Sequence, residues 1–181
     1  MLSHFQKRKL TRYFNTLDRD AKGFIEEEDI YMINLRMAQK NGIEENSEGW
    51  DKIRDNVDMI WKYARRYGVS GDPDKVFLID WLAHEESILA DDWFLENYVK
   101  KITRDVFLLF MQPEDERLYL SDYRQLIGCF GVEEGVQPWA FDQLDRDGKG
   151  YLTCDEFVKC VEEFHLSRER YAPGNFLFGP F

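Results

Sequence analysis

Two stretches of this chain place acidic residues at the same spacing. Residues 18–23 read DRDAKG and residues 145–150 read DRDGKG, and a further acid follows each stretch, at Asp29 and Glu156. Carboxylate oxygens spaced around a turn-forming glycine are the ligands that a hard divalent cation prefers. Cation binding is therefore the first chemistry that the sequence indicates.

The spacing matches a twelve-residue calcium loop, which supplies oxygens from positions 1, 3, 5, 7, 9 and 12 and turns at a glycine in position 6. This frame gives two candidate loops, residues 18–29 and 145–156. The candidate ligands are side-chain carboxylates at positions 1, 3 and 12 and a main-chain carbonyl at position 7: Asp18, Asp20, Asp29 and Phe24 in the first loop, and Asp145, Asp147, Glu156 and Tyr151 in the second. We predict Ca²⁺ as the bound ion and Mg²⁺ as a competitor, because Asp29 is one methylene shorter than the usual glutamate and favours a smaller ion.

Position 5 breaks the pattern in both loops, because Lys22 and Lys149 stand where an oxygen ligand is expected. An ammonium group offers donors and no acceptor, so it cannot bind a cation. The lysine can swing outward and leave its place to water, or fold inward among the carboxylates as an internal counter-ion. A third reading is that both loops keep their turn and bind nothing.

The composition predicts a folded, acidic protein. The chain has 181 residues, 44% hydrophobic and 15% aromatic, which is enough core for one compact domain or two small lobes. The net charge of −11 argues against nucleic acid and anionic membranes as partners. No signal peptide and no apolar run of about 20 residues are evident. The three cysteines, Cys129, Cys154 and Cys160, lack metal-ligand spacing. We therefore expect a monomer in the reducing cytoplasm.

Apolar residues recur at helical spacing along the whole chain. The third expected helix carries Ile53, Val57, Ile60, Trp61 and Ala64 on one face, and the fifth carries Val99, Ile102, Val106, Leu109 and Phe110. The pattern predicts a compact all-α fold of eight helices in four helix–loop–helix units, arranged as two packed pairs. The expected pairs are residues 1–92 and 93–181, and the second ends in an apolar tail.

The two middle loops, residues 69–80 and 111–122, keep an acid at position 12, and the loop 111–122 also has Asp115 at position 5. Their other ligand positions hold residues such as Val69, Pro73 and Met111, which cannot assemble an oxygen cage. We predict that neither binds a cation and that each pairs with an outer loop. The apolar residues at position 8 of the outer loops, Ile25 and Leu152, suit a short strand for this pairing.

The whole chain resembles the sarcoplasmic calcium-binding proteins and their calexcitin relatives, within the EF-hand superfamily. The resemblance rests on the order of candidate and degenerate loops, on Asp29 at position 12, on the stretch YRQLIGCFGV at 123–132 and on the tail GNFLFGPF at 174–181. It implies two EF-hand pairs packed face to face around a shared core, and a cytosolic Ca²⁺/Mg²⁺ buffer, with the calexcitin branch linked to neuronal signalling. The chain departs from the family in both position-5 lysines and in its third loop.

Three functions follow from these features. The first is a cytosolic EF-hand protein that buffers Ca²⁺ and Mg²⁺ or senses Ca²⁺ weakly. The second is an EF-hand scaffold that has lost calcium binding and acts through a protein partner or a small hydrophobic ligand in its core. The third, suggested by the similar photoproteins and luciferin-binding proteins, is a chromophore binder lined by His84 or His165, although core packing explains these residues more simply.

No phosphate-binding loop, nucleophile elbow or histidine pair indicates an enzyme. Glu85 and Glu86 are adjacent carboxylates, and we predict that they lie on a solvated helix face.

Overall fold

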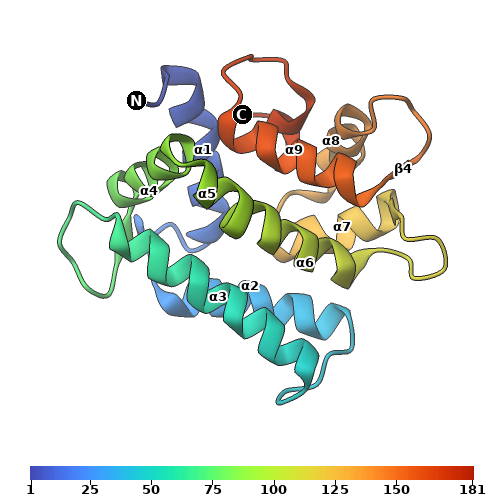
Figure 1. The fold of residues 1–181 in the computed structure, drawn as a ribbon, viewed down its shortest axis with the longest axis horizontal. Coiled ribbons are helices and arrows are strands. Elements are labelled where there is room, and N and C mark those ends of the chain that lie inside the picture. The colour runs from blue at the N-terminus through green and yellow to red at the C-terminus, as the bar shows by residue number, and fades with distance from the viewer.

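The structure, a computed structural model, describes residues 1–181 apart from the side chain of Val57, so the predicted place of Val57 on a helix face lies outside it. The longer helices are α1 (His4–Leu17), α2 (Glu27–Lys40), α3 (Glu48–Arg66), α4 (Leu78–Ala90), α6 (Lys100–Phe110), α7 (Leu120–Cys129), α8 (Gln137–Leu144) and α9 (Cys154–Leu166) (Figure 1). Shorter elements are α5 (Asp92–Phe94), a π-helical turn (Leu95–Val99) and 3₁₀ turns at Glu134–Val136 and Pro173–Phe176. This arrangement confirms the predicted all-α, EF-hand fold class.

Two-residue strands join the calcium-type loops in pairs. They are β1 (Phe24–Ile25), β2 (Val76–Phe77), β3 (Leu118–Tyr119) and β4 (Tyr151–Leu152). β1 pairs antiparallel with β2, with Ile25 opposite Val76, and β3 pairs with β4, with Leu118 opposite Leu152. These four side chains are buried and stand at position 8 of their loops. The first loop is therefore tied to the second, and the third to the fourth.

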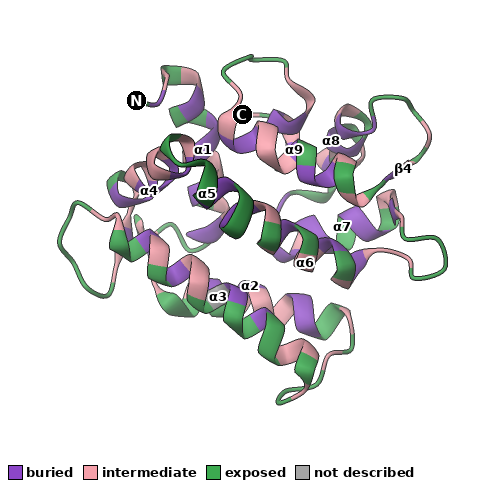
Figure 2. Ribbon diagram, viewed as in Figure 1, coloured by how far each residue is buried: buried purple, intermediate pink, exposed green. Residues whose placement is uncertain are grey.

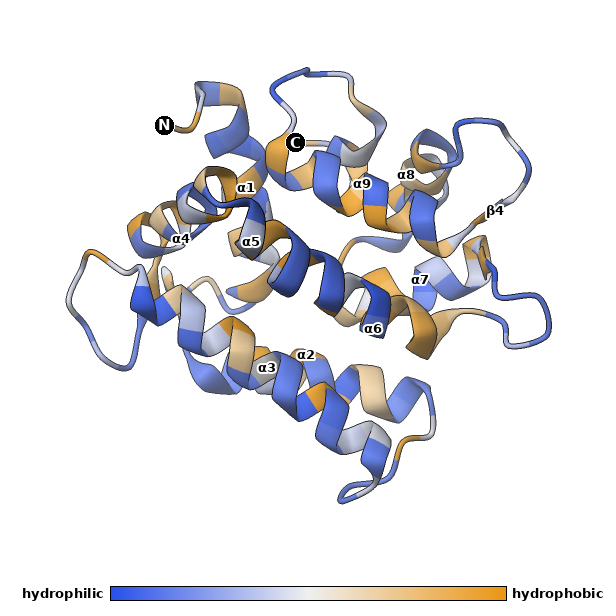
Figure 3. Cartoon of the chain, viewed as in Figure 1, coloured by the Kyte–Doolittle hydropathy of each residue, from blue (hydrophilic) through white to orange (hydrophobic). Residues whose placement is uncertain are grey.

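One apolar core runs through both halves of the chain. Leu10, Phe14 and Leu17 follow one face of α1 at intervals of three and four residues, and all are buried. They belong to the same cluster as Tyr123 of α7 and Phe164 of α9. Figure 2 shows buried stripes on the inward faces of the helices, and Figure 3 shows that the projecting loops are mostly hydrophilic.

The first helical segment of the second half contains a π-helical turn near its start. Asp92 starts one helical run that passes through α5 and the π-helical turn into α6 (Figure 1). The most deeply buried residues of α6 include Thr103 and Phe107, which the predicted face did not contain. The predicted Val106 and Leu109 are partly buried against the same core.

The C-terminal tail completes this core. Leu177 and Phe178 are buried, and the Phe178 ring stacks on Tyr13 with 4.5 Å between centroids. Tyr123 donates its hydroxyl hydrogen to the carbonyl of Leu177 at 2.8 Å, and Arg12 Nε donates to the carbonyl of Phe178 at 2.8 Å. The tail is thus held by the first helix and by the second half of the chain.

Lys9 fastens this tail to α9. Its buried ammonium donates to the carbonyls of Glu163 (3.1 Å) and Ser167 (2.9 Å) and to Asn175 Oδ1 (2.7 Å). The Glu163 carbonyl also accepts from the Ser167 N–H, and Ser167 directly follows α9, so Lys9 adds a donor at the C-terminal end of this helix. Burial lowers the pKa of Lys9 to about 7, against the opposing charges of Glu85 and Glu163.

Gly174 explains how closely the tail approaches α9. A Cβ atom at this position would overlap the carbonyl oxygen of Cys160.

Cys129, Cys154 and Cys160 are free thiols. In the described part of the chain, no helix combines the length and the apolar character needed to cross a bilayer.

Candidate metal centres

The loop 145–156 begins with Asp145, whose carboxylate accepts main-chain hydrogen bonds from within the loop. Asp145 accepts hydrogen bonds from the main-chain N–H groups of Lys149 (3.2 Å) and Gly150 (2.6 Å). Gly150 has a φ of +86°, a conformation that a side chain would strain, so the glycine at position 6 is required by the turn.

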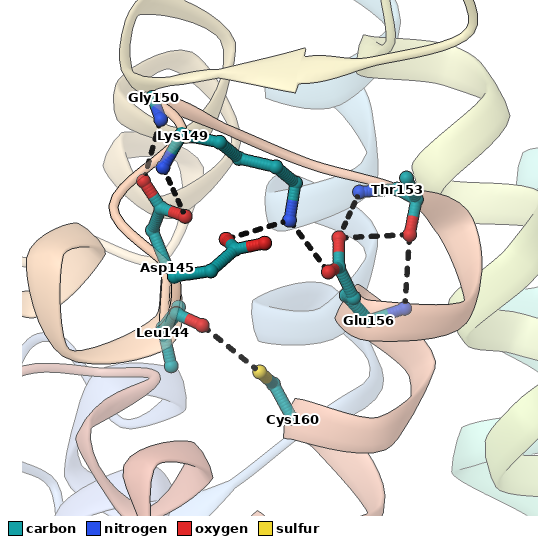
Figure 4. A network of polar contacts seen from close by, with 8 residues as sticks. Leu144, Asp145, Lys149, Gly150, Thr153, Glu156 and Cys160 are labelled. Atoms are coloured by element: carbon teal, nitrogen blue, oxygen red, sulfur yellow. Dashed lines mark hydrogen bonds and ion pairs between the residues drawn. The ribbon is translucent and has the colours of Figure 1, made fainter.

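Lys149 folds into this loop instead of pointing to solvent. Its Nζ lies 2.5 Å from Glu156 Oε1 and 3.0 Å from Asp147 Oδ1. Figure 4 shows the side chain reaching across the loop to Glu156. The other oxygen of Glu156 accepts from the main-chain N–H (2.9 Å) and the hydroxyl (2.8 Å) of Thr153. The position-12 carboxylate is thus held by a cation on one side and by the start of α9 on the other.

These contacts shift the ionisation of the loop toward charged forms. The hydrogen bond to Glu156 raises the pKa of Lys149 above its ordinary value, and Asp147 adds to this effect. Burial raises the pKa of Glu156, but the hydrogen bonds from Lys149 and Thr153 outweigh burial and lower it overall. The hydrogen bond from Lys149 also lowers the pKa of Asp147.

The loop 18–29 repeats this arrangement with a shorter acid. Lys22 Nζ lies 2.8 Å from both carboxylate oxygens of Asp29, 3.4 Å from Asp20 and 3.6 Å from Glu26. Asp18 accepts from the main-chain N–H groups of Lys22 (2.9 Å) and Gly23 (2.8 Å). Burial lowers the pKa of Lys22, but the hydrogen bond and charge of Asp29, with help from Asp20, raise it overall.

Of the two arrangements left open by the sequence, the structure has the inward one in both loops. Each ammonium lies where the carboxylates of positions 3 and 12 converge, at a place that suits a cation. Phe24 and Tyr151, whose carbonyls are the candidate ligands at position 7, lie in β1 and β4, and the ammonium groups lie 5.5 and 5.1 Å from their ring centroids.

In the described residues, no three acidic, histidine or cysteine side chains gather in metal-ligand geometry. The acids of both loops face a lysine instead. In each loop the acids at positions 3 and 12 already surround one cation, the ammonium, and a divalent ion would have to take its place.

The two middle loops are closed by their own donors. Asp80 accepts from the main-chain N–H groups of Val69 (2.6 Å), Ser70 (2.7 Å) and Phe77 (2.9 Å). Burial raises the pKa of Asp80, but these hydrogen bonds outweigh it and lower the pKa. Every carboxylate oxygen at this position thus already has a donor.

Asp122 is buried in the same way in the loop 111–122. It accepts from the Gln112 side chain at 2.6 Å and from the Tyr119 N–H at 2.9 Å. Like Asp29 and Glu156, it lies in the first turn of the helix that follows its loop. The position-12 acid therefore keeps a capping role where the other ligands are lost.

A second polar cluster, which includes Glu85, lies in the core. The prediction that Glu85 lies on a solvated helix face was therefore wrong. Glu85 is 2% exposed and lies 2.7 Å from His165 Nδ1, because α4 packs against α9 on this face and His165 supplies the partner that a buried carboxylate needs. Glu86 is half-exposed and pairs with the N-terminal ammonium.

His84 is buried in the same cluster. Its Nε2 lies 3.4 Å from the Tyr98 hydroxyl, and burial lowers its pKa to about 4. The two histidines line a core cavity of about 90 Å³, whereas sites for small organic ligands usually measure about 300–1,000 Å³. Core packing therefore describes them better than a chromophore site.

Two curated proteins are similar to parts of this chain. Calerythrin from Saccharopolyspora erythraea is 24% identical over 113 residues, which are 50% of this chain and 63% of calerythrin. The probable calcium-binding protein CML34 from Arabidopsis thaliana is 33% identical over 61 residues, which are 32% of this chain and 46% of CML34. The chain thus spans less than two thirds of each of these relatives. No family model matches the sequence.

Solved structures share the fold over most of the chain. A sarcoplasmic calcium-binding protein from amphioxus aligns with a TM-score of 0.71 and 17% identity, covering 100% of both chains. Magnesium-loaded apo-berovin, a ctenophore photoprotein, aligns with a TM-score of 0.66 and 19% identity, covering 87% of this chain and 86% of its own. Together with calerythrin, these neighbours confirm the resemblance that the sequence predicts.

Proposed function

Because this chain has the fold of the EF-hand proteins, we propose that it binds Ca²⁺ by exchanging an internal ammonium for the ion. The observation that carries this proposal is the position of Lys149, whose Nζ lies between Asp147 and Glu156 where a cation would be bound. Lys22 holds the corresponding place beside Asp29 in the first loop. Of the two curated relatives, CML34 is described as a probable calcium-binding protein. For this chain, calcium binding is part of the proposal.

The ligands follow from the loop frame. In the second loop they are the carboxylates of Asp145, Asp147 and Glu156 and the carbonyl of Tyr151. A Ca²⁺ ion brings two charges and takes six to eight oxygens, so it gains more from these groups than one ammonium does. Part of that gain is spent on displacing the lysine, and no oxygen replaces it at position 5. The affinity is therefore lower than in a loop with a full set of ligands.

The first loop supplies Asp18, Asp20 and Asp29 with the carbonyl of Phe24. The short side chain of Asp29 gives fewer oxygens and favours a small ion, so Mg²⁺ competes here. The photoprotein berovin, a structural neighbour, binds magnesium in its three Ca²⁺-binding loops, which supports the proposal that Mg²⁺ competes here.

The closed core favours a buffer or a weak sensor. A strong sensor exposes an apolar groove when it binds Ca²⁺. Here the tail residues Leu177 and Phe178 fill the core between the helices. We assign the protein to the cytoplasm as a non-enzymatic monomer whose ligand is a divalent cation.

A scaffold that no longer binds Ca²⁺ is the second candidate. It is favoured by the contact of Lys149 with Glu156, because that ion pair completes the loop with no metal. In this reading the two lysines hold the loops in shape and the function lies in a protein partner.

A calorimetric titration of metal-stripped protein with Ca²⁺, with and without millimolar Mg²⁺, tests the proposal. We expect one or two binding events with dissociation constants of about 10⁻⁵ M or tighter, within the range of cytosolic EF-hand loops. A flat trace, together with an unchanged melting temperature in Ca²⁺, would instead favour the scaffold.

A further inference from the structure

A pocket of about 680 Å³ lies beside the degenerate loop 69–80, outside both calcium-type sites. Its wall is formed by the C-terminal part of α3 and by the loop that leads to β2 (Figure 1). This volume is within the range of small-molecule sites, about 300–1,000 Å³. The loop contributes Gly71, Pro73, Lys75 and Asp80 to the lining, and the carboxylate of Asp80 is already bound by main-chain N–H groups.

Four cations converge on this pocket without a carboxylate partner. They are Lys62, Arg65, Arg66 and Lys75. Among the described residues, none of the four lies within ion-pair distance of an acid. Lys52 and Arg54 lie on the same helix α3 outside the pocket, and each of them is paired, with Glu48 and Asp51. The pairing thus stops where the pocket begins.

Aromatic rings hold the pocket cations in place. The Arg65 guanidinium lies 5.5 Å from the Trp61 ring, and Lys75 Nζ lies 4.3 Å from the Phe24 ring. Lys62 and Arg66 lie 5.8 Å from the rings of their neighbours Tyr63 and Tyr67. Such contacts orient a cation but do not neutralise it. The pocket lining thus holds four cations that have no ion-pair partner within the part of the chain that the structure describes, alongside the four carboxylates of Glu27, Asp58, Asp72 and Asp80.

The pocket also has acids, but they do not satisfy the cations. Asp80 is bound by three main-chain N–H groups, and Asp72 accepts from the main-chain N–H of Asp74 at 2.9 Å. Glu27 and Asp58 line the remainder and are exposed. The two carboxylates of the loop are thus engaged by main-chain N–H donors, whereas the four cations have no described acid within ion-pair distance.

Trp61 supplies a separate sign of a ligand. Its side chain lines the pocket, the residue is only 5% exposed, and its indole N–H has no hydrogen-bond acceptor among the described residues. An unsatisfied buried donor costs about 1–3 kcal/mol. The indole nitrogen itself has less than 1 Å² of accessible surface, so an acceptor oxygen would remove that cost only by displacing the side chains that cover it.

We infer that this pocket binds a small multivalent oxyanion, with Arg65, Arg66 and Lys75 as charge partners and the Trp61 indole N–H as a neutral donor. Multivalent carboxylates and phosphates share this chemistry, because both present several acceptor oxygens to guanidinium and ammonium groups. The inference does not depend on calcium binding, since none of its residues is a candidate calcium ligand.

The test follows the indole N–H resonance of Trp61 by two-dimensional ¹H–¹⁵N NMR, with Trp61→Phe to assign the peak. The protein is stripped of metal on a chelating resin, because soluble chelators are themselves multivalent carboxylates. Pyrophosphate and citrate are titrated separately at constant ionic strength, with sodium chloride as the control. A saturable shift with a dissociation constant of about 1 mM or tighter is expected for at least one of them, and which anion binds identifies the phosphate or the carboxylate class.

Matched charge variants decide whether the shift reports this pocket. Arg65→Gln with Arg66→Gln should weaken binding by about tenfold or more, and Lys75→Gln should weaken it through a different element. Lys52→Gln with Arg54→Gln removes the same charge from the same helix and should change binding by less than about twofold. The inference is overturned if neither anion shifts the resonance saturably, or if the control pair weakens binding as much as the pocket pair does.

Discussion

Replacing Lys149 with methionine is the sharpest perturbation of the proposed exchange. Methionine has a similar length but carries no charge and no oxygen ligand, so the variant removes the competing ammonium and adds nothing that Ca²⁺ prefers. In the absence of metal, Asp145, Asp147 and Glu156 would face one another without a counter-ion. We expect the variant to be less stable than the wild type without Ca²⁺ and to bind Ca²⁺ more tightly.

The magnitude follows from the contact with Glu156. A hydrogen bond between charged groups contributes about 1.5–3 kcal/mol when it is shielded, and an exposed ion pair contributes about 0.2–1 kcal/mol. The side chains of Lys149 and Glu156 are 20% and 42% exposed, which places this pair between the two cases. In Lys149→Met, Ca²⁺ binding no longer has to break this contact, which removes a cost of about 1 kcal/mol. That difference corresponds to about fivefold tighter Ca²⁺ binding.

Calorimetry on three proteins measures this change. The control is Lys159→Met, which removes the same charge from an exposed position of α9 outside the loop. Lys149→Asp should tighten binding further than Lys149→Met, because it also restores an oxygen at position 5. If Lys149→Met binds Ca²⁺ no more tightly than the Lys159→Met control, displacement of the ammonium does not limit the site and the reasoning is refuted.

Three further changes test other parts of the structure. Glu156→Gln should abolish the heat of Ca²⁺ binding at its own loop while the helical circular dichroism is preserved, and an unchanged titration would show that this loop is not a site. Gly174→Ala should lower the unfolding free energy by about 1–3 kcal/mol in chemical denaturation, because its methyl group would overlap Cys160. Lys9 has a folded pKa of about 7 and an unfolded value of 10.5, so the unfolded state binds more protons between these pH values and this residue makes stability rise with pH across that window. In Lys9→Met that rise, at most about 1.4 kcal/mol per pH unit, should be missing, and equal slopes in both proteins would contradict the lowered pKa.

The sequence was sufficient to predict the helical pairs and the fold class. The repeat of residues 18–23 at 145–150 set the register of the outer loops, and the apolar residues at position 8 indicated how loops would pair. Both signals are local, because a loop of fixed length and a helix of fixed period depend on near neighbours in the chain.

The direction in which the two loop lysines point could not be predicted from the sequence. Whether Lys22 and Lys149 turn outward or inward depends on whether a long, flexible side chain gains more from two carboxylates than from water. The sequence shows both partners, but not that Asp29 and Glu156 lie within reach once the loop closes.

The prediction for Glu85 was wrong because its partner is distant in the sequence. Its neighbours along the chain are polar enough for a solvated face, and the partner that permits burial, His165, is 80 residues away. Thr103 and Phe107 were missed because α6 carries apolar residues on more than one face, and periodicity alone does not choose between such faces. A contact between distant elements has no local signature.

The fastening of the tail by Lys9 has a consequence for how the molecule comes apart. Lys9 of α1 binds the end of α9 and Asn175 of the tail, so the first and last segments of the chain are in direct contact. Two lobes joined only by a linker could melt one after the other. Here, neither half can lose its structure without breaking this contact, so heating should produce a single cooperative transition in which both halves unfold together.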